Sequence, residues 1–275
     1  MYIYTAWYIF LMQYRCLLFK MPAIKYCIYL ILCNIDFSLQ DIIWILYVLP
    51  DLPNLVVTNY YSMEKTDDAN LLTLKYGPAV LAYTPYPKPW NPGVEKVKAI
   101  YLGCDPSNRS QDRFEYAFAL EGTNPRYRAF LKSHEDNLAA VNLGWDKVYV
   151  QNLCQNYFRE ETSKNLKLWR QVVREFWIPR LKEELSIFGQ NIPVLLTSQY
   201  LLEVLAFDGY EKIHAFDFYN CDQPIPVPAS KNHMERPLIP FYRGRNPRLK
   251  ETYHLSNDRW GRYRERMKVV IFATH

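Results

Sequence analysis

Short apolar runs alternate with stretches of helical composition from about residue 97 onward, and this alternation constrains the fold more than any other feature. The runs are typical of buried strands and comprise Val97–Gly103, Lys147–Leu153, Ile192–Thr197 and Pro237–Arg243. Residues 124–143, 161–188 and 200–206 lie between them and are typical of helices. Strands joined through helices need crossover connections, which build a parallel sheet covered on both faces. The sequence therefore predicts a three-layer α/β/α domain with a short parallel sheet of about four strands.

The longest helical stretch is Glu161–Phe188. We expect Thr162 or Ser163 to cap its start, because a side-chain hydroxyl accepts a hydrogen bond from the first helical turn. We expect Pro179 to kink or divide it, because proline has no backbone N–H to donate. A basic helix over Trp260–Lys268 is expected near the end of the chain.

The net charge of +5 is unevenly distributed. Residues 1–62 carry three basic and three acidic side chains and are rich in tyrosine, isoleucine and leucine. All of the excess positive charge therefore belongs to residues 63–275. We predict a boundary here: residues 1–62 form an apolar N-terminal extension, residues 63–275 form the α/β domain, and Met63 is an alternative start.

Three interpretations of residues 1–62 stay open. The segment is an upstream extension outside the working domain, a helical appendage packed on that domain, or a membrane anchor. A membrane-spanning helix needs about 20 consecutive apolar residues, and the apolar runs here are interrupted sooner, for example by Arg15, Asn34 and Pro50. The basic start and small-residue cleavage site of a signal peptide are not evident. We therefore expect no membrane partner.

The six cysteines form no Cys-x-x-Cys pair and show no zinc or iron–sulfur spacing. No two of the five histidines have the helical spacing of a metal site. We therefore expect no metal and no cofactor. The cysteines are expected to be reduced thiols of a cytoplasmic, monomeric protein.

The carboxyl ends of the strands are where ligands bind in such sheets. The first strand ends at Gly103 and is followed by Asp105, and the second ends near Asn152. A glycine lets the backbone approach a ligand, a carboxylate can act on a substrate, and an amide can bind a base edge through both donors and an acceptor. The structural alternatives are that Asp105 caps a turn beside Pro106 and that Asn152 satisfies loop backbone groups.

A basic and aromatic segment follows the fourth strand. Between Lys231 and Lys268 there are eleven Lys or Arg residues against four Asp or Glu residues. Basic side chains contact phosphates and aromatic rings stack on bases, whereas the alternative is a solvated surface. Tyr242, Tyr253, Trp260 and Tyr263 are interleaved with the basic residues. The expected nucleic-acid contacts are Arg245, Arg248, Arg259 and Arg262.

These residues resemble the uracil-DNA glycosylase superfamily. The family's first motif is a strand leading into Gly-Gln-Asp-Pro-Tyr-His, followed by a phenylalanine in an Ala-Phe segment. The counterpart here is Gly-Cys-Asp-Pro-Ser-Asn at residues 103–108, and Phe118 follows Gly103 at the family's interval of fifteen residues. The family's second strand ends in an asparagine that binds uracil, and Asn152 stands at that place. The resemblance covers roughly residues 95–270.

The resemblance implies a uracil-DNA glycosylase-like fold and a DNA-repair glycosylase that hydrolyses the N-glycosidic bond of a flipped-out uracil or related damaged base. DNA, single- or double-stranded, would be its partner, and no metal would be needed. Asp105 would activate the water that attacks the sugar C1′, Phe118 would stack on the base, and Asn152 would bind its edge. The remaining substrate-binding residues would be Gly103, Cys104, Pro106 and Ser107.

The sequence departs from the family pattern at three places. The tyrosine that bars the thymine methyl is Ser107, which puts exclusion of thymine in doubt, and the motif histidine is Asn108. The His-Pro-Ser motif after the last strand is missing, and residues 242–245 occupy that region. Arg243, a permanent cation, is the catalytic candidate for stabilising the leaving base, or else a phosphate contact.

Two histidines were considered as well. His233 precedes the fourth strand and is an alternative replacement for the lost family histidine. His134 lies in a predicted helix and is expected at the surface.

Three functions stay open at this level. The first is the base-excising hydrolase, favoured by Asp105, Phe118 and Asn152. The second is a non-catalytic nucleic-acid-binding protein on the same fold, favoured by the missing His-Pro-Ser motif. The third is a hydrolase of small nucleosides or nucleotides, against which the basic segment argues. Fold alone cannot decide among them.

Overall fold

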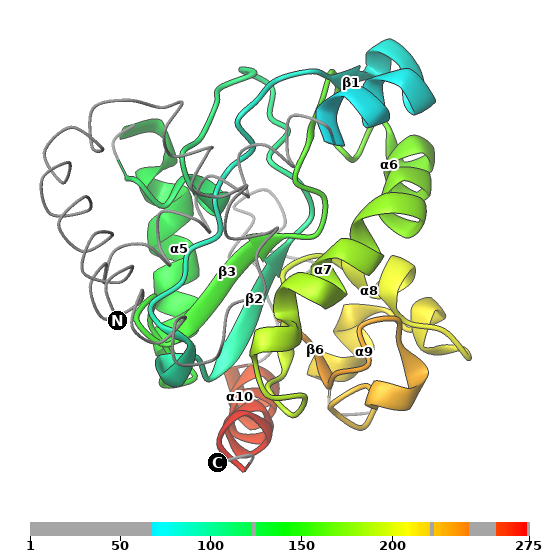
Figure 1. The fold of residues 1–275 in the computed structure, drawn as a ribbon. Helices are drawn as coiled ribbons and strands as arrows, with labels where there is room; N and C mark the ends of the chain where they lie inside the picture. Colours follow the sequence, from blue (N-terminus) through cyan, green and yellow to red (C-terminus); the bar gives the residue numbers. More distant parts are fainter. Residues whose placement is uncertain (1–67, 123–124, 221–222, 242–256, 274–275) are drawn as a thin grey trace, which may run out of the picture. The chain divides into compact units, whose positions relative to one another are not determined.

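A four-stranded parallel sheet forms the centre of the protein (Figure 1). The computed structural model describes residues 68–122, 125–220, 223–241 and 257–273. The strand order is β3-β2-β5-β6, and every strand residue is buried, as expected of a sheet covered on both faces. The strands are β2 (Ala99–Gly103), β3 (Val148–Asn152), β5 (Val194–Leu196) and β6 (Leu238–Pro240).

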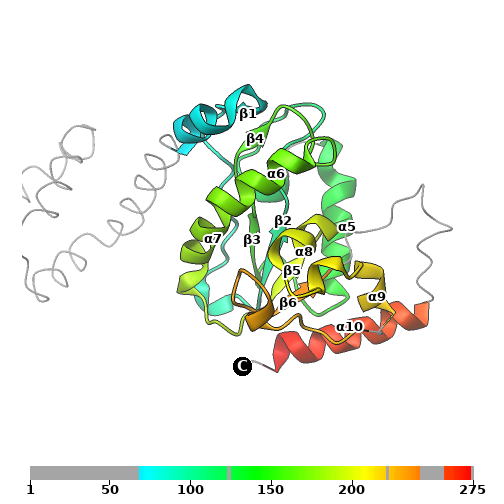
Figure 2. The same ribbon diagram turned by 90° about the vertical axis from the view of Figure 1, so that its right-hand side faces the viewer.

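Helices cover both faces of this sheet. Figure 2 shows α6 and α7 on one side of the strands and α5 on the other. The prediction of a three-layer α/β/α domain with four parallel strands is therefore confirmed. The helices are α5 (Arg128–Ala139), α6 (Leu166–Val172), α7 (Ile178–Glu184), α8 (Gln199–Leu205), α9 (Ala215–Tyr219) and α10 (Asn257–Phe272), and residues 68–76 are also helical.

The side chains of neighbouring strand residues alternate between the two helical layers. Tyr101 of β2 lies in register with Val150 of β3 and hydrogen-bonds His134 of α5. Tyr149, one residue earlier on β3, instead donates to Glu184 at the end of α7. By this alternation the register pair Gly103 and Asn152 lies on the α5 side, like Tyr101 and Val150.

The expectation that His134 lies at the surface is wrong. Its side chain is 1% exposed, and its ring packs against Phe118 and Phe130 with centroid distances of 5.2 and 4.4 Å. His134 and Leu138 lie four residues apart, so both side chains fall on the buried face of α5. The hydrogen bond to Tyr101 gives the imidazole a polar partner inside this apolar layer.

The order of the strands locates the crevice of the sheet. The chain places β3 on one side of β2 and then β5 and β6 on the other side. The direction of winding therefore reverses beside β2. In open α/β sheets this switch point lies next to the ligand-binding crevice at the carboxyl ends of the strands.

The long helical stretch predicted from residue 161 begins later and is divided. Its first helix starts at Leu166, and a π-helical segment, Val173–Trp177, separates α6 from α7. In this segment the N–H of Ile178 bonds to the carbonyl of Val173, five residues back. Pro179, near the start of α7, has no N–H to continue the α-helical ladder. The expected division at Pro179 is therefore confirmed.

Two short strands lie outside the main sheet, and the sequence patterns did not predict them. β1 (Val80–Leu81) pairs antiparallel with β4 (Tyr157–Phe158). Each is only two residues long, so neither gives a recognisable alternation of polar and apolar side chains. The pair places the chain after β3 next to the loop after β2.

The predicted boundary at residues 62 and 63 lies outside the described residues, as do residues 1–62 themselves. Within the described ranges, no helix combines the length and the apolar character needed to cross a bilayer.

Buried Arg236 joins the amino ends of β5 and β6. It is 3% exposed, and its guanidinium donates to the carbonyls of Leu185, Phe188 and Gly189. Burial lowers the pKa of this arginine, because the charged form loses its hydration. Three hydrogen bonds offset that cost.

We predict that Arg236→Met lowers the free energy of unfolding by about 2 kcal/mol, because carbonyls that accept from the guanidinium lose a buried partner. Urea denaturation followed by circular dichroism measures the change. Exposed Arg128 on α5 is the control, and Arg128→Met should shift stability by less than about 0.5 kcal/mol. Equal stability of both variants would show that the Arg236 bonds contribute nothing net.

Candidate functional site

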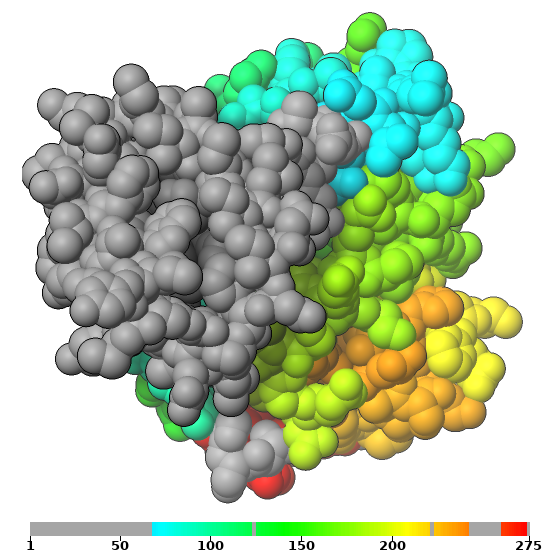
Figure 3. Space-filling view, in the orientation of Figure 1, coloured from blue at the N-terminus to red at the C-terminus, as the bar shows by residue number. Residues whose placement is uncertain are grey.

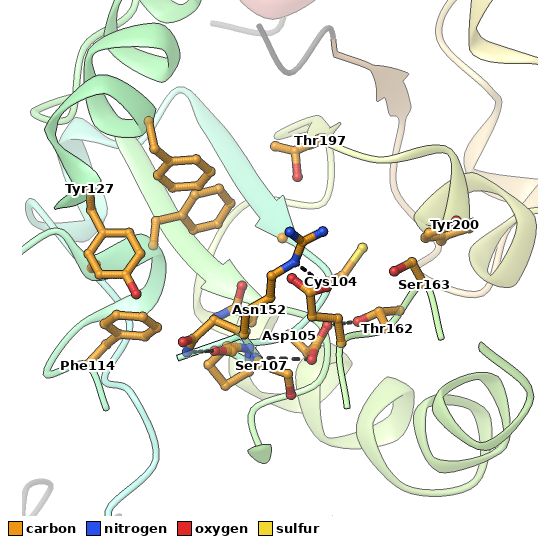
Figure 4. A pocket seen from close by; sticks show the side chains of 18 of the residues that line it. Cys104, Asp105, Ser107, Phe114, Tyr127, Asn152, Thr162, Ser163, Thr197 and Tyr200 are labelled. Atoms are coloured by element: carbon orange, nitrogen blue, oxygen red, sulfur yellow. Dashed lines mark hydrogen bonds and ion pairs between the residues drawn. The ribbon is translucent and has the colours of Figure 1, made fainter. Parts of the chain in front are cut away.

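A pocket of about 800 Å³ lies at the carboxyl ends of β2, β3 and β5. Its lining comes from five segments: residues 103–109, residues 114–130, Asn152, residues 161–163 and residues 197–200. Figure 4 shows Phe114 and Tyr127 on one side, Thr162, Ser163 and Tyr200 on the other, and Cys104, Asp105 and Asn152 between them. The pocket volume lies within the range of small-molecule sites.

Gly103, the last residue of β2, lies close to both Asn152 of β3 and Phe118. A Cβ atom on Gly103 would lie 2.4 Å from Oδ1 of Asn152 and 2.7 Å from Cε2 of Phe118. Real Cβ atoms do not approach other atoms so closely, so only glycine fits here without displacing a neighbour. Asn152 and Phe118 therefore both contact the backbone of Gly103 from different parts of the chain.

Asn152 presents an amide to this pocket. Its side chain is 4% exposed, lines the pocket and makes no hydrogen bond to the described protein. Its backbone N–H donates to Oε1 of Gln151 at 2.9 Å, and Nε2 of Gln151 donates to Glu184 at 2.8 Å. The Gln151 side chain thus satisfies the Asn152 N–H at the edge of the sheet. A buried amide without a protein partner is suited to bind a polar ligand edge.

Phe118 forms part of the aromatic side. It lies in the short 3₁₀ segment Ala117–Ala119 with a φ of 63°, a left-handed conformation that a bulky residue adopts at a cost. Its half-buried ring lies nearly parallel to Phe130 at a centroid distance of 6.1 Å and packs against Tyr101 at 5.3 Å. The packing offsets the backbone strain and leaves part of the ring facing the pocket.

Asp105 is held at both carboxylate oxygens. Oδ2 accepts the backbone N–H of Ser107 at 3.1 Å, and Oδ1 accepts the hydroxyl of Thr162. The carboxylate is half-buried and lines the pocket. Asp105 therefore caps the turn, as the structural alternative predicted, and its side chain also faces the pocket.

Two nearby pKa values follow from this environment. Burial raises the pKa of the Cys154 thiol, and the negative charge of Asp105 raises it further, so the thiol stays protonated and donates to Asn156 at 3.0 Å. Burial, followed by its hydrogen bond to Asp112, raises the pKa of Tyr127 to about 12. Both groups are neutral near pH 7. Cys154 lies outside the pocket lining, in which Asp105 and Glu161 are the acidic residues.

Ser107 and Asn108 make the hydrogen bonds that shape the loop. The Ser107 hydroxyl accepts the backbone N–H of Phe158 on β4 at 2.7 Å. The Asn108 side chain accepts from the N–H groups of Ser110 and Asp112 and donates to carbonyls of Pro106 and Asp112. Both residues line the pocket, but the Ser107 oxygen is engaged with β4 and the Asn108 amide with its own loop.

Two arginines also line the pocket. Nε of Arg109 donates to Glu161 at 3.2 Å, and Arg126 lies 3.7 Å from Asp112. The Arg109 and Arg126 side chains are 82% and 60% exposed, which places them at the mouth rather than the floor.

The structure gathers seven of the predicted site residues in this one pocket, and they come from three separate parts of the chain. The seven are Gly103, Cys104, Asp105, Pro106, Ser107, Phe118 and Asn152. Arg243, Arg245 and Arg248 lie outside the described residues. Arg259 lies on α10, and Arg262 is exposed on α10, which contributes nothing to the pocket lining.

Tyr263 of α10 does not offer its ring for stacking. Tyr263 is fully buried and donates to the carbonyl of Pro240 at 2.6 Å. Trp260 is partly buried and stacks on Tyr263 at a centroid distance of 5.8 Å. The expectation that Tyr263 is available to bases is wrong, because the helical spacing directs it into the core.

His233 lies away from this pocket. It lines a second cavity, of about 770 Å³, between α7 and residues 229–235. Figure 3 shows the face on which α7 (yellow-green) and the segment that includes residues 229–235 (orange) adjoin. The idea that His233 replaces the lost family histidine is therefore wrong.

The expectation that Thr162 or Ser163 caps the helix is wrong. Asn165, not either hydroxyl, precedes α6, and Thr162 and Ser163 line the pocket. The bond between Thr162 and Asp105 joins residues 57 positions apart, so no local pattern could have revealed it. After β5, Ser198 caps α8, and Thr197 lines the pocket while donating to the carbonyl of Leu102.

Apart from Phe118, the aromatic and cationic members of the lining were also missed. Phe114, Tyr127 and Phe130 follow no strand end, and Arg109 and Arg126 lie in loops whose path the sequence does not determine. A search of the described residues finds no group of three or more His, Cys, Asp or Glu side chains placed to hold a metal ion. No protein-family model matches the chain, and no curated protein matches it.

We predict that Gly103→Ala destabilises the protein by about 2 kcal/mol and weakens ligand binding, because the added methyl must displace Asn152 or Phe118. Gly189→Ala is the control, since a Cβ there meets nothing within 4 Å. Thermal unfolding of both variants measures the difference. An unchanged melting temperature for Gly103→Ala would contradict the close packing described above.

Proposed function

We propose that this protein is a DNA-repair glycosylase that hydrolyses the N-glycosidic bond of a flipped-out uracil or related damaged base. The observation that carries the proposal is that Asp105, Phe118 and Asn152 line one pocket at the carboxyl ends of the strands. The resemblance to uracil-DNA glycosylases rested on these three residues, which lie far apart in the sequence. Their convergence supports the proposal.

The two sides of the pocket suit a nucleobase. The ring of Phe118 offers a face on which a planar base can stack, an interaction worth roughly 1–3 kcal/mol per base. The amide of Asn152 offers donors and an acceptor to the polar edge of the same base. Since this amide is buried and has no partner among the described residues, a base edge would satisfy it.

Asp105 carries the chemistry in this proposal. Cleavage of the glycosidic bond develops positive charge on the sugar and negative charge on the departing base. A carboxylate near C1′ stabilises the sugar cation and orients the attacking water. The bonds from Thr162 and Ser107 hold both oxygens of Asp105, so its orientation is fixed before the substrate arrives.

Base selection and leaving-group stabilisation differ from the family pattern. Ser107 is small and is tied to β4, so it offers no bulky ring to bar a thymine methyl. Asn108, at the place of the motif histidine, is engaged within its own loop. Stabilisation of the base anion is therefore assigned to Arg243, which lies outside the described residues.

A non-catalytic nucleic-acid-binding protein is the second candidate. The observation that favours it is that the polar atoms of Ser107 and Asn108 serve the loop rather than the pocket. Such a protein would bind DNA through the same pocket and release no base. Hydrolysis of free nucleosides is the third candidate, and its test is the activity on nucleosides without phosphate.

The experiment that separates these candidates is a screen of the full chain against oligonucleotides containing uracil, hypoxanthine or a thymine mismatch, scored for abasic sites. Abasic product from at least one duplex or single strand supports the glycosylase. Tight, salt-dependent binding without abasic product supports the binding protein. Release of base from nucleosides alone would replace both with the third candidate.

We predict that Asp105→Asn lowers base excision by about 10²–10⁴-fold while DNA affinity changes little, because the amide keeps the shape of the carboxylate but loses its charge. Abasic-site formation measures excision, and fluorescence anisotropy measures binding. Asp208→Asn is the matched control, since Asp208 lies in an exposed turn outside the pocket and pairs with Lys231. Equal excision by wild type and Asp105→Asn would remove Asp105 from the mechanism.

A further inference from the structure

We propose that Arg109 and Arg126 form a phosphate clamp at the mouth of the pocket, which holds the backbone of a nucleic-acid strand on either side of the nucleotide that enters. This inference rests on the proposed use of the pocket for a base, and it identifies the ligand as a nucleotide within a strand. It places phosphate contacts at the pocket itself, in addition to those expected of Arg259 and Arg262 on α10.

Arg109 is oriented for such a contact by Glu161. The hydrogen bond uses Nε of the guanidinium, which leaves the two terminal nitrogens of Arg109 without a hydrogen-bond partner in the described structure. A guanidinium held through Nε presents those two nitrogens as a pair, the geometry that matches two phosphate oxygens. The side chain is 82% exposed, so a phosphate can reach it from solvent.

Arg126 supplies the second cation from a different segment. It belongs to the short 3₁₀ turn Pro125–Tyr127 that precedes α5, whereas Arg109 lies in the loop after β2. Asp112 lies 3.7 Å from its guanidinium, beyond the usual hydrogen-bond distance. Exposed pairs of this kind contribute little stability, so a phosphate can compete with Asp112 for the guanidinium of Arg126.

The negative charge inside the pocket favours entry of an uncharged part of the ligand. Asp105 lies between the two sides of the pocket, and a phosphate placed beside it would be repelled (Figure 4). A neutral base meets no such repulsion and can contact Phe118 and Asn152. The ligand therefore has an uncharged planar part that enters and anionic parts that stay at the rim, as a nucleotide within a strand does.

Salt dependence of binding is the test. The variants are Arg109→Gln, Arg126→Gln and the double variant of the full chain, and the probe is a fluorescein-labelled single-stranded thymidine 15-mer with one central deoxyuridine. We expect each single variant to weaken binding about five- to tenfold and to reduce the slope of log affinity against log salt by about 0.7, the value for one lost phosphate contact.

Lys96→Gln is the matched control. It removes the same charge from an exposed side chain that precedes β2, at the opposite end of that strand from the pocket. Its affinity and salt slope should equal those of the wild type. Both arginines are more than half exposed, so the variants should fold normally, which circular dichroism checks.

A competition experiment distinguishes a phosphate within a strand from the phosphate of a free nucleotide. Deoxyuridine and deoxyuridine monophosphate are each used to displace the 15-mer from wild type and variants. A loss of affinity in the variants that is confined to the 15-mer supports a clamp on a strand. An equal loss of affinity for the monophosphate would overturn the assignment to a strand in favour of a free nucleotide. An equal loss of affinity for deoxyuridine would overturn the phosphate contact altogether.

Two further outcomes would also overturn the clamp. The first is an unchanged salt slope in the double variant. The second is a fall in excision rate with unchanged affinity, which would make Arg109 a participant in the chemistry. Because the readout is binding, a protein that excises no base can still show the clamp, so failure of the proposed function and failure of this inference are distinguishable.

Discussion

The parallel pairing of β2 with β3 is the constraint on which the site depends. The register places Gly103 opposite Asn152 at the last paired position of both strands. Because Gly103 has no Cβ, the Asn152 amide and the Phe118 ring can both approach its backbone. A shift by one residue would send Asn152 to the opposite face of the sheet, toward α7. Pocket and sheet are thus determined by the same hydrogen-bonded register.

Buried polar bonds hold this register and orient the pocket. Glu184 on α7 accepts from Tyr149, Gln151 and Gln155, and Gln151 in turn accepts the N–H of Asn152. These bonds join β3 to the helix behind it and satisfy an open strand edge. The Asn152 amide faces the pocket from the other direction and makes no hydrogen bond to the described residues. Other polar residues of the lining, such as Asp105 and Asn108, also make the hydrogen bonds that hold the loop.

The rim of the pocket follows a different principle. Its ion pairs, Arg109 with Glu161 and Arg126 with Asp112, are exposed and contribute little to stability. In the phosphate clamp that we propose, a ligand phosphate takes the place of the carboxylate in each pair.

The sequence by itself determined the architecture, because buried strands and amphipathic helices leave periodic apolar patterns that local chain geometry requires. It also determined that Gly103, Asp105 and Asn152 stand near strand ends, where parallel sheets bind ligands. Only the tertiary structure decided that Thr162 holds Asp105, that His134 and Tyr263 are buried, and that Arg109 and Arg126 line the pocket. These facts depend on contacts between distant segments and on the paths of loops, which no local periodicity encodes.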